Sequence, residues 1–418
     1  MTMSSDAPKE SFRLSMLIYD TRYRSLTIQV VALMAFMLAA AWIIDNTLQN
    51  LAELGKPIEF GFLSEPAQYD INQALIEYDN QDSHLRASFV GLLNTLLVAV
   101  LGCALATVVG VIVGVLRLSK NWLVARIMTV YVEMFRNVPV LLWIVFFMAI
   151  LIESLPQPRA FRGADPEASM LLGDSVALTN RGFYIPEPLF SNPLGDLSVF
   201  GAFNISLELL ALVGALAVSL FLSGLVKKRA DRIQNETGIR PTTWYLRLGI
   251  VVLPLIAILI ALGFHLGNPE LRGFNFQGGI HMRTSLIALW LALSFYTAAF
   301  IAEIVRGGIM AISKGQTEAA SALGLRPNRI MSLVILPQAL RVIIPPLISQ
   351  YLNLTKNSSL AIAVGYMDIT GTLGGITMNQ TGRELECVVM LMLCYLTISL
   401  TISLVMNWYN TRVKLVER

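Results

Sequence analysis

The chain has 418 residues, of which 55% are hydrophobic and 14% are charged, and its mean hydropathy is +0.63. A composition this apolar excludes an ordinary soluble domain and is typical of an integral membrane protein, so the lipid bilayer is its first expected partner. The formal net charge is only +3, and we expect no nucleic-acid partner. No CxxC pair occurs, so packing rather than metal or redox chemistry is expected of the three cysteines, Cys103, Cys387 and Cys394.

Eight apolar runs predict membrane-spanning helices, because a helix needs about 20 residues to cross the hydrocarbon core of a bilayer. Backbone groups at an open sheet edge would stay unsatisfied in lipid, so the fold class is predicted to be an all-α polytopic membrane protein. The first run is too long for an ordinary signal core and is interpreted as an uncleaved helix. The runs are roughly Leu26–Ile44, Phe89–Leu116, Val138–Ile152, Phe203–Val226, Trp244–Leu266, Thr284–Val305, Ile330–Val364 (too long for one span and interrupted by proline) and Cys387–Trp408.

Lysine and arginine gather in every second connecting segment, which sets the expected orientation. The segments between them are acidic or mixed, as in the first outer loop, Asp45–Arg86. Eight spans therefore place both chain ends in the cytoplasm. The basic clusters lie in the N-terminal segment with Lys9, Arg13, Arg22 and Arg24, and in Arg117–Arg136, Lys227–Arg247, Lys314–Arg329 and Arg412–Arg418.

Small residues recur every four positions in the second run, at Gly102, Ala106, Gly110 and Gly114. This spacing puts them on one face of a helix, where they allow another helix to approach closely. We expect that face to be a packing seam rather than a gate.

A short, nearly uncharged segment, 313–324, lies between two long apolar runs on the predicted cytoplasmic side. Ser313 and Gln316 fit a capping box, and Gly324 fits a left-handed helix end with Pro327 beyond it. At 1.5 Å per residue such a helix is about 15 Å long, too short to cross a bilayer. An isolated helix of this length is marginal in water, so we expect it to dock against a cytoplasmic protein partner.

The same segment carries a family resemblance. Glu318-Ala319-Ala320, then Gly324, Val334 and Leu336-Pro337 resemble the EAA-x3-G-x9-I-x-LP signature of ABC importer permeases, with valine in place of isoleucine. In that family the short helix couples the permease to an ATP-hydrolysing subunit. The resemblance therefore implies that the ATPase-coupling residues are Gln316, Glu318, Ala319, Ala320, Gly324 and Pro337.

Further motifs resemble the polar amino-acid subfamily of these permeases, which serves histidine, glutamate, glutamine, arginine and opines. The length and the large outer insertion resemble the longer permease subunit of general L-amino-acid or glutamate/glutamine/aspartate/asparagine transporters. The motifs are GLLNTLLVAVLG (Gly91–Gly102), YVEMFRNVPVLLW (Tyr131–Trp143), AAFIAEIVRGGI (Ala298–Ile309), LPQALRVIIPPL (Leu336–Leu347) and KNSSLA (Lys356–Ala361).

This resemblance implies a type I importer permease core with accessory helices, in the bacterial inner membrane. It also implies three partners: a cytoplasmic ABC ATPase dimer, a second homologous permease forming a heterodimer, and a periplasmic amino-acid-binding protein. The expected organisation is a cytoplasmic segment 1–25, an accessory helix and outer loop 26–88, a first core part 89–153, an outer insertion with an accessory helix pair 154–276, and a second core part 277–418 containing the coupling helix 313–324.

No nucleotide-binding loop is present, because Gly315 is followed by glutamine rather than by the Lys-Ser/Thr of a phosphate-binding loop. We therefore expect no catalytic, cofactor or metal site in this chain, with ATP and Mg²⁺ bound by the partner ATPase. His84, His265 and His281 lie in or beside outer segments, where solvated side chains are expected.

Polar residues inside spans are costly and therefore informative. Glu303 and Arg306 can pair across one helical turn, either as a structural ion pair or as part of a transport path. The cluster Lys356, Asn357, Ser358 and Ser359 could line a route for an amino acid or could bond between helices. Downstream, the glycines between Gly371 and Gly382 predict a flexible outer loop.

Two alternatives to an ABC permease remain from the residues alone. An ion-coupled secondary amino-acid transporter would use its own buried charges, but such transporters often have paired repeats with broken helices, and only one strongly broken span is found. A scaffold or sensor without transport would leave the polar cluster at 356–359 without a route to line.

Overall fold

The computed structural model describes residues 16–163, 165–199 and 203–413. The basic residues Lys9, Arg13, Lys414 and Arg418, and both chain ends, lie outside them. Within the described residues, eight helical segments are long and apolar enough to cross a membrane, which confirms the predicted number. The helices are α1 (Met16–Tyr19), α2 (Thr21–Glu53), α3 (His84–Leu116), α4 (Trp122–Asn137), α5 (Val140–Ser154), α6 (Leu207–Thr237), α7 (Trp244–Ala261), α8 (Thr284–Met310), α9 (Lys314–Ala322), α10 (Pro327–Ile330), α11 (Leu336–Asn357), α12 (Ile369–Gly371), α13 (Met378–Thr381) and α14 (Glu384–Val413).

The structure differs from the prediction in the segment before the third span. Residues around Arg126 and Arg136 were expected in a basic loop, but they form the separate helix α4. The chain breaks between α4 and α5 because Pro139 disfavours a helical conformation in the residue before it, and Val138 is extended at φ −111° and ψ 133°. The guanidinium carbon of Arg136 lies 5.5 Å from the ring centre of Phe300, so Arg136 makes a cation–π contact with this ring.

The centre of the bundle is the seam between α3 and α8, as the small-residue spacing predicts. A Cβ atom added at Gly110 would lie 2.6 Å from the Cβ of Ile301, and one at Gly114 would lie 2.7 Å from the carbonyl oxygen of Ala302. Ala106 on the same face is fully buried. The absence of side chains at these glycines therefore sets the distance between the two helices.

The seventh span is a continuous helical rod in which the hydrogen-bond pattern changes three times. It begins with α10, passes a wide π-helical turn at Met331–Ile335, continues as α11 through Pro345 and Pro346, and tightens into a 3-10 turn at Ser358–Val364. The wide turn ends two residues before Pro337, whose ring would clash with a regular helical carbonyl and which has no N–H to donate.

The flexible outer loop predicted between Gly371 and Gly382 is wrong. After a left-handed turn at Gly365, the chain forms α12, a π-helical turn at Thr372–Thr377 and α13. The glycines serve close packing instead: a Cβ at Gly374 would lie 3.0 Å from a methyl group of Leu391 on α14.

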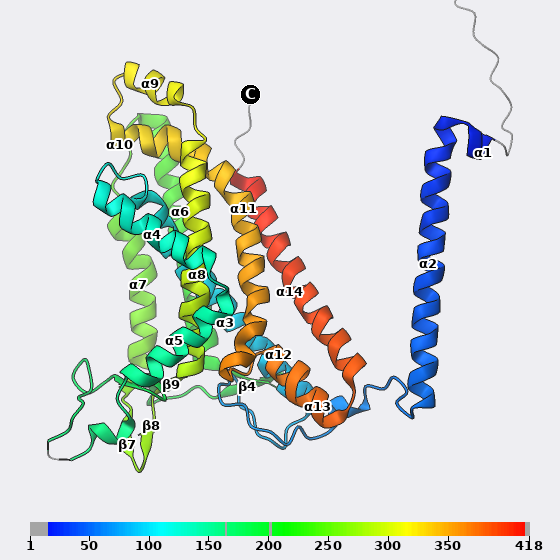
Figure 1. Cartoon of the computed structure of the whole chain (residues 1–418). Coiled ribbons are helices and arrows are strands. Elements are labelled where there is room, and N and C mark those ends of the chain that lie inside the picture. The colour runs from blue at the N-terminus through cyan, green and yellow to red at the C-terminus, as the bar shows by residue number, and fades with distance from the viewer. Residues whose placement is uncertain (1–15, 164, 200–202, 414–418) are drawn as a thin grey trace, which may run out of the picture.

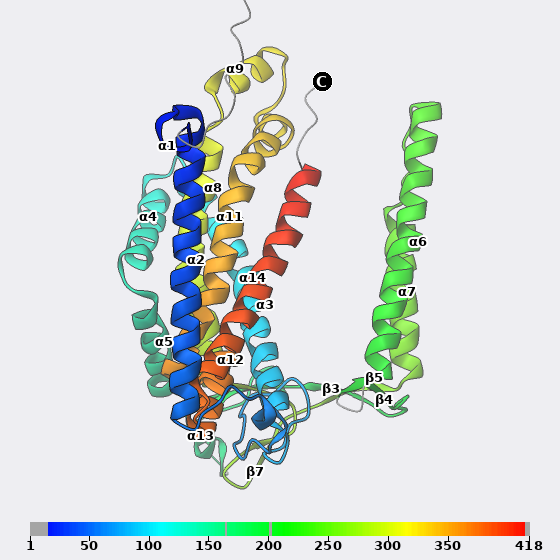
Figure 2. The same ribbon diagram turned by 90° about the vertical axis from the view of Figure 1, so that its right-hand side faces the viewer.

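Three helices stand apart from this bundle. Figure 1 shows α2 well to one side of it, and Figure 2 shows the α6–α7 hairpin separated from it on another side. Two-stranded ribbons connect the hairpin to the rest of the chain. They are β3 (Glu187–Phe190) with β6 (Phe264–Gly267), and β4 (Asp196–Val199) with β5 (Phe203–Ser206).

The outer segments add short strands to the helical fold. β1 (Ala177–Thr179), β2 (Gly182–Ile185) and β9 (Ile280–Arg283) form an antiparallel sheet, and β7 (Glu270–Arg272) pairs with β8 (Asn275–Gln277). β9 runs directly into α8, with Arg283 opposite Gly182. The all-α class is thus confirmed for the spans, and the strands lie outside them.

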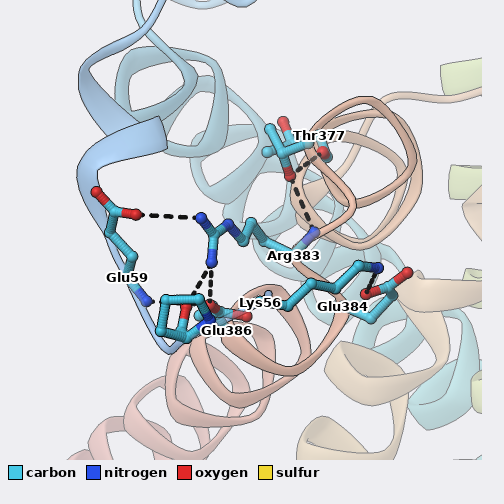
Figure 3. A network of polar contacts seen from close by, with 8 residues as sticks. Lys56, Glu59, Thr377, Arg383, Glu384 and Glu386 are labelled. Atoms are coloured by element: carbon cyan, nitrogen blue, oxygen red, sulfur yellow. Dashed lines mark hydrogen bonds and ion pairs between the residues drawn. The ribbon is translucent and has the colours of Figure 1, made fainter. Parts of the chain in front are cut away.

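An ionic network anchors the segment after α2 to the start of α14 (Figure 3). Arg383 binds the carboxylate of Glu59 at 3.1 Å and that of Glu386 at 3.5 Å, and Lys56 binds Glu384 at 3.5 Å. The Glu59 amide also donates to Glu386 at 3.1 Å. These contacts hold the first outer loop on the bundle although α2 itself stands away from it.

Candidate functional site

The predicted short helix is present as α9, and it lies beyond the ends of the spans (Figure 1). Its end is the one that the sequence predicts: Gly324 is left-handed at φ +76°, with no atom within 4 Å of the position a Cβ would take. Leu325 closes the turn through a bond from its amide to the Ala320 carbonyl at 3.3 Å. A residue with a side chain would be strained at Gly324.

The predicted capping box is not formed. Ser313 is the N-cap residue, but its hydroxyl makes no cap bond, and the Gln316 amide donates to the Ser313 backbone carbonyl at 3.1 Å. The Gln316 side chain turns toward α11, where its Oε1 accepts from Gln338 Nε2 at 3.4 Å. Gln316 therefore bridges the short helix to the long one instead of closing its own helix end.

The six predicted coupling residues fall into two groups. Gln316, Glu318, Ala319 and Gly324 are exposed on α9 and its end. Ala320 is buried at 5% exposure, in a small apolar cluster with Ile330 and Ile335, and Pro337 is half-buried in the first turn of α11. The first group offers a surface to a partner, and the second joins α9 to the seventh span.

Glu303 lies between two arginines near the end of α8 that leads to α9. Arg306 donates to it at 2.5 Å, as its spacing predicts, and Arg117 at the end of α3 donates to its other oxygen. Arg117 was not predicted as a partner, because it lies 186 residues away along the chain. The arrangement joins α3 to α8 and compensates one carboxylate with two guanidinium groups, which fits a structural ion pair.

The polar cluster at the end of α11 contains both buried and accessible residues. Ser358 is fully buried and donates to the Thr355 carbonyl at 2.8 Å, and Ser359 donates to the Lys356 carbonyl at the same distance. Lys356 is exposed and Asn357 is half-buried. The hydroxyls therefore bond to their own helix, and within this cluster the side chains of Lys356 and Asn357 make no hydrogen bond to the described part of the chain.

Sequence reasoning missed two polar residues on the same face of α11. Ser349 and Asn353 are exposed, and together with Lys356 they follow a spacing of four and three residues, which is one helical face. The signal was available in the sequence as that spacing. An exposed polar stripe on a transmembrane helix is unfavourable in lipid, so it must face protein or water.

One histidine prediction is wrong. His84 is buried at 4% exposure, and its Nδ1 lies 3.1 Å from the Thr377 hydroxyl, because α3 starts beneath the helical segment that replaces the expected outer loop. His265 is exposed, as expected, whereas His281 is half-buried and stacks on Tyr184 with ring centres 4.2 Å apart.

Among the described residues, no group of three or more histidine, cysteine, aspartate or glutamate side chains could hold a metal ion.

Comparison with known proteins identifies the family. A family profile described as "Binding-protein-dependent transport system inner membrane component" matches residues 241–415. The glutamate/glutamine/aspartate/asparagine transport system permease protein BztB of Rhodobacter capsulatus is 58% identical over the full length of both chains. The chain belongs to the permeases of amino-acid ABC transporters. It is thus a multi-pass membrane protein and a transport subunit.

Other permeases of this family match over different lengths. The general L-amino acid transport system permease protein AapQ of Rhizobium johnstonii is 44% identical over 98% of this chain and 96% of its own. The probable glutamine ABC transporter permease protein GlnM of Bacillus subtilis is 35% identical over 49% of this chain and 89% of its own. About half of this permease therefore corresponds to nearly all of a shorter one.

Proposed function

We propose that this permease imports polar L-amino acids across a bacterial inner membrane, coupled through α9 to a separate ATPase. The substrate class is supported by the names of the relatives, which include glutamate, glutamine, aspartate and asparagine. The single observation that carries the coupling role is the exposed helix with the EAA residues, which stands beyond the spans and bears Glu318 on its surface (Figure 1).

The orientation follows from the position of α9. The start of α2 and the end of α14 lie at the same end of the molecule as α9 (Figure 1), and the basic segments Arg117–Arg136, Lys227–Arg247 and Lys314–Arg329 belong to that end. Positive charge is enriched on the cytoplasmic side of membrane proteins. Both ends of the chain and α9 are therefore proposed to be cytoplasmic.

Movement of α9 would be transmitted to the seventh span through the contacts between them. Ala320 packs on Ile330 and Ile335, and Gln316 bonds to Gln338, so the short helix and the seventh span move as one body. An ATPase that binds α9 differently in its open and closed states would shift α11 between two positions. The exposed stripe with Asn353 and Lys356 would then change its access to either side of the membrane.

The stripe also supports a second permease subunit. A lysine and an asparagine on the surface of a span need contact with protein or with water. A homologous permease facing Lys356 would supply protein contacts and a water-filled space. The remaining proposed partners are a cytoplasmic ABC ATPase dimer that binds ATP and Mg²⁺, and a periplasmic amino-acid-binding protein. This chain is proposed to bind no cofactor of its own, and an ion-coupled mechanism gains no support from the relatives.

The coupling role is tested by replacing Gly324 with valine, which is strained at positive φ. We expect Gly324→Val to lose co-purification of the ATPase and to lower ATP-driven uptake at least tenfold. Gly315→Ala is the matched control, because Gly315 is in the same helix with no atom within 4 Å of its Cβ position. Unchanged ATPase association and uptake in the Gly324→Val protein would contradict the proposal.

A further inference from the structure

A cavity of about 410 Å³ with both polar and apolar lining lies on the outer side of the permease, where β9 meets α8. Figure 1 shows this region, near β8 and β9, at the end opposite α9. The volume is in the range of small-molecule binding sites. Val364 and Gly365, which end the helical rod that begins at α10, complete the wall, and the polar lining includes Asn72, Asn180, Arg181, Asn275, His281 and Arg283.

The turn between β1 and β2 places one arginine at the cavity. Arg181 directly precedes Gly182, which has φ +147° and lies opposite Arg283 in the sheet. A Cβ at Gly182 would lie 2.4 Å from the Met282 carbonyl and 2.6 Å from His281 Nε2. Only glycine fits there, so the turn and β9 stay close enough for both arginines to line one cavity.

The second arginine is held by the first outer loop. Arg283 Nε donates to the Asn72 carbonyl at 3.0 Å, and its backbone N–H donates to Gln73 Oε1 at 3.1 Å. These contacts hold the Arg283 side chain in place and use one of the five N–H donors of its guanidinium group. Its terminal nitrogens remain available to a ligand.

Within the described residues, neither charge has a carboxylate partner. Across residues 16–163, 165–199 and 203–413, no carboxylate lies within 4.0 Å of the guanidinium of Arg181 or Arg283. Arg181 reaches only the Phe274 carbonyl, at 3.4 Å. By contrast, Arg272 on the neighbouring ribbon pairs with Glu270 at 2.8 Å. Two uncompensated guanidinium groups on one wall favour an anion, and a carboxylate matches their planar donors.

The same cavity offers an acceptor for a cation. Asn180 Oδ1 is buried and receives no hydrogen bond from the described part of the chain, while the Asn180 backbone carbonyl is already bonded to the Thr284 hydroxyl at 2.8 Å. Burial and the nearby Arg283 lower the pKa of His281, so this ring adds no competing positive charge at neutral pH. This oxygen has almost no accessible surface, so the Asn180 amide has to turn toward the cavity for an ammonium group to satisfy it.

We propose that this cavity binds a free amino acid with an acidic side chain, whose carboxylates pair with Arg181 and Arg283 and whose ammonium group donates to Asn180. The site lies on the outer side of the permease, next to the outer end of the seventh span. It concentrates acidic substrates there. That the ligand is transported cargo rests on the proposed import of polar amino acids; binding itself does not.

The test measures L-glutamate binding to the purified full-length chain in nanodiscs, without a delivery protein, by isothermal titration calorimetry. We expect glutamate to bind and glutamine to bind at least tenfold more weakly. Arg181→Gln and Arg283→Gln should each weaken glutamate binding at least tenfold, and added salt should weaken it in the wild type. Arg283→Lys keeps the charge and should retain part of the affinity. Arg272→Gln is the matched control and should leave it unchanged.

Two results would overturn the proposal. One is no glutamate binding by the wild-type chain, or equal binding by the Arg181→Gln and Arg283→Gln variants. The other is that these variants lose only docking of the delivery protein while free glutamate has no effect, which would assign the arginines to a carboxylate on that protein. ATP-driven uptake by the assembled wild-type transporter in proteoliposomes is measured separately. Failure there with intact glutamate binding would count against the import function and not against this site.

Discussion

A single buried carboxylate, Asp368, joins three parts of the bundle at the end opposite α9. It accepts from the Gly371 amide at 2.9 Å, which caps α12, and from the Tyr395 hydroxyl of α14 at 3.2 Å. Tyr395 also lies 3.5 Å from the buried Ser358 hydroxyl at the end of α11. These partners are neutral. They satisfy hydrogen bonds of the Asp368 carboxyl group, but they do not compensate its negative charge when it is ionised.

Replacing Asp368 with asparagine should stabilise the permease at neutral pH. Burial raises the pKa of Asp368 from 3.8 to about 6, so ionisation above pH 6 costs the folded state about 3 kcal/mol. That cost is absent below about pH 4, where the residue is protonated in both folded and unfolded states. Thermal unfolding in detergent should therefore show a higher Tm for Asp368→Asn at pH 7.5, with a difference that shrinks toward pH 4.5.

The exposed Asp70 is the control, and Asp70→Asn should not raise the Tm at pH 7.5. A gap between wild type and Asp368→Asn that stays constant with pH, or an asparagine variant that is less stable at pH 7.5, would contradict this account. The second result would show that the bonds to Gly371 and Tyr395 require a carboxylate.

At the scale of elements, the α3–α8 seam sets the packing of the bundle. Gly110→Ala should destabilise the chain by about 1 to 3 kcal/mol, because the new Cβ would lie 2.6 Å from Ile301 and 3.0 Å from the Ala298 carbonyl. Gly214→Ala on α6 is the control, since no atom lies within 4 Å of its Cβ position, and it should be neutral or slightly stabilising. Chemical denaturation in mixed micelles compares the two, and equal stability for both variants would mean that the seam can relax.

Across the whole molecule, the features that could be predicted from sequence are those that depend on local spacing. The eight spans, the glycine seam, the left-handed end at Gly324 and the Glu303–Arg306 pair all follow from residues a few positions apart. What could not be predicted depends on contacts between distant segments. Arg117 reaches Glu303 across 186 residues and His84 reaches Thr377 across 293, and neither pairing leaves a periodic signal in the sequence.

The α6–α7 hairpin offers a test of how independent the parts of this permease are. Its helices pack on each other and connect to the bundle through β-ribbons, and Figure 2 shows them standing apart. Glu187 and Gly267 are directly opposed in the β3–β6 ribbon, so residues 188–266 can be replaced by a two-residue Asn-Gly turn without moving either strand end. The three-stranded sheet with β9, the α3–α8 seam and α9 would all remain.

The shortened chain should insert into the membrane and keep the stability of its bundle, because no buried core residue of that bundle is removed. We expect the free energy of unfolding to change by less than about 1 kcal/mol, which corresponds to a Tm shift of under about 4 °C. Co-purification of the ATPase should be retained. Fluorescence-detected size-exclusion chromatography and thermal unfolding measure both. If the shortened chain aggregates while Gly214→Ala behaves as wild type, the hairpin supports the fold rather than extending it. Retained stability with lost uptake would instead assign the hairpin a role in assembly or transport that the bundle alone does not supply.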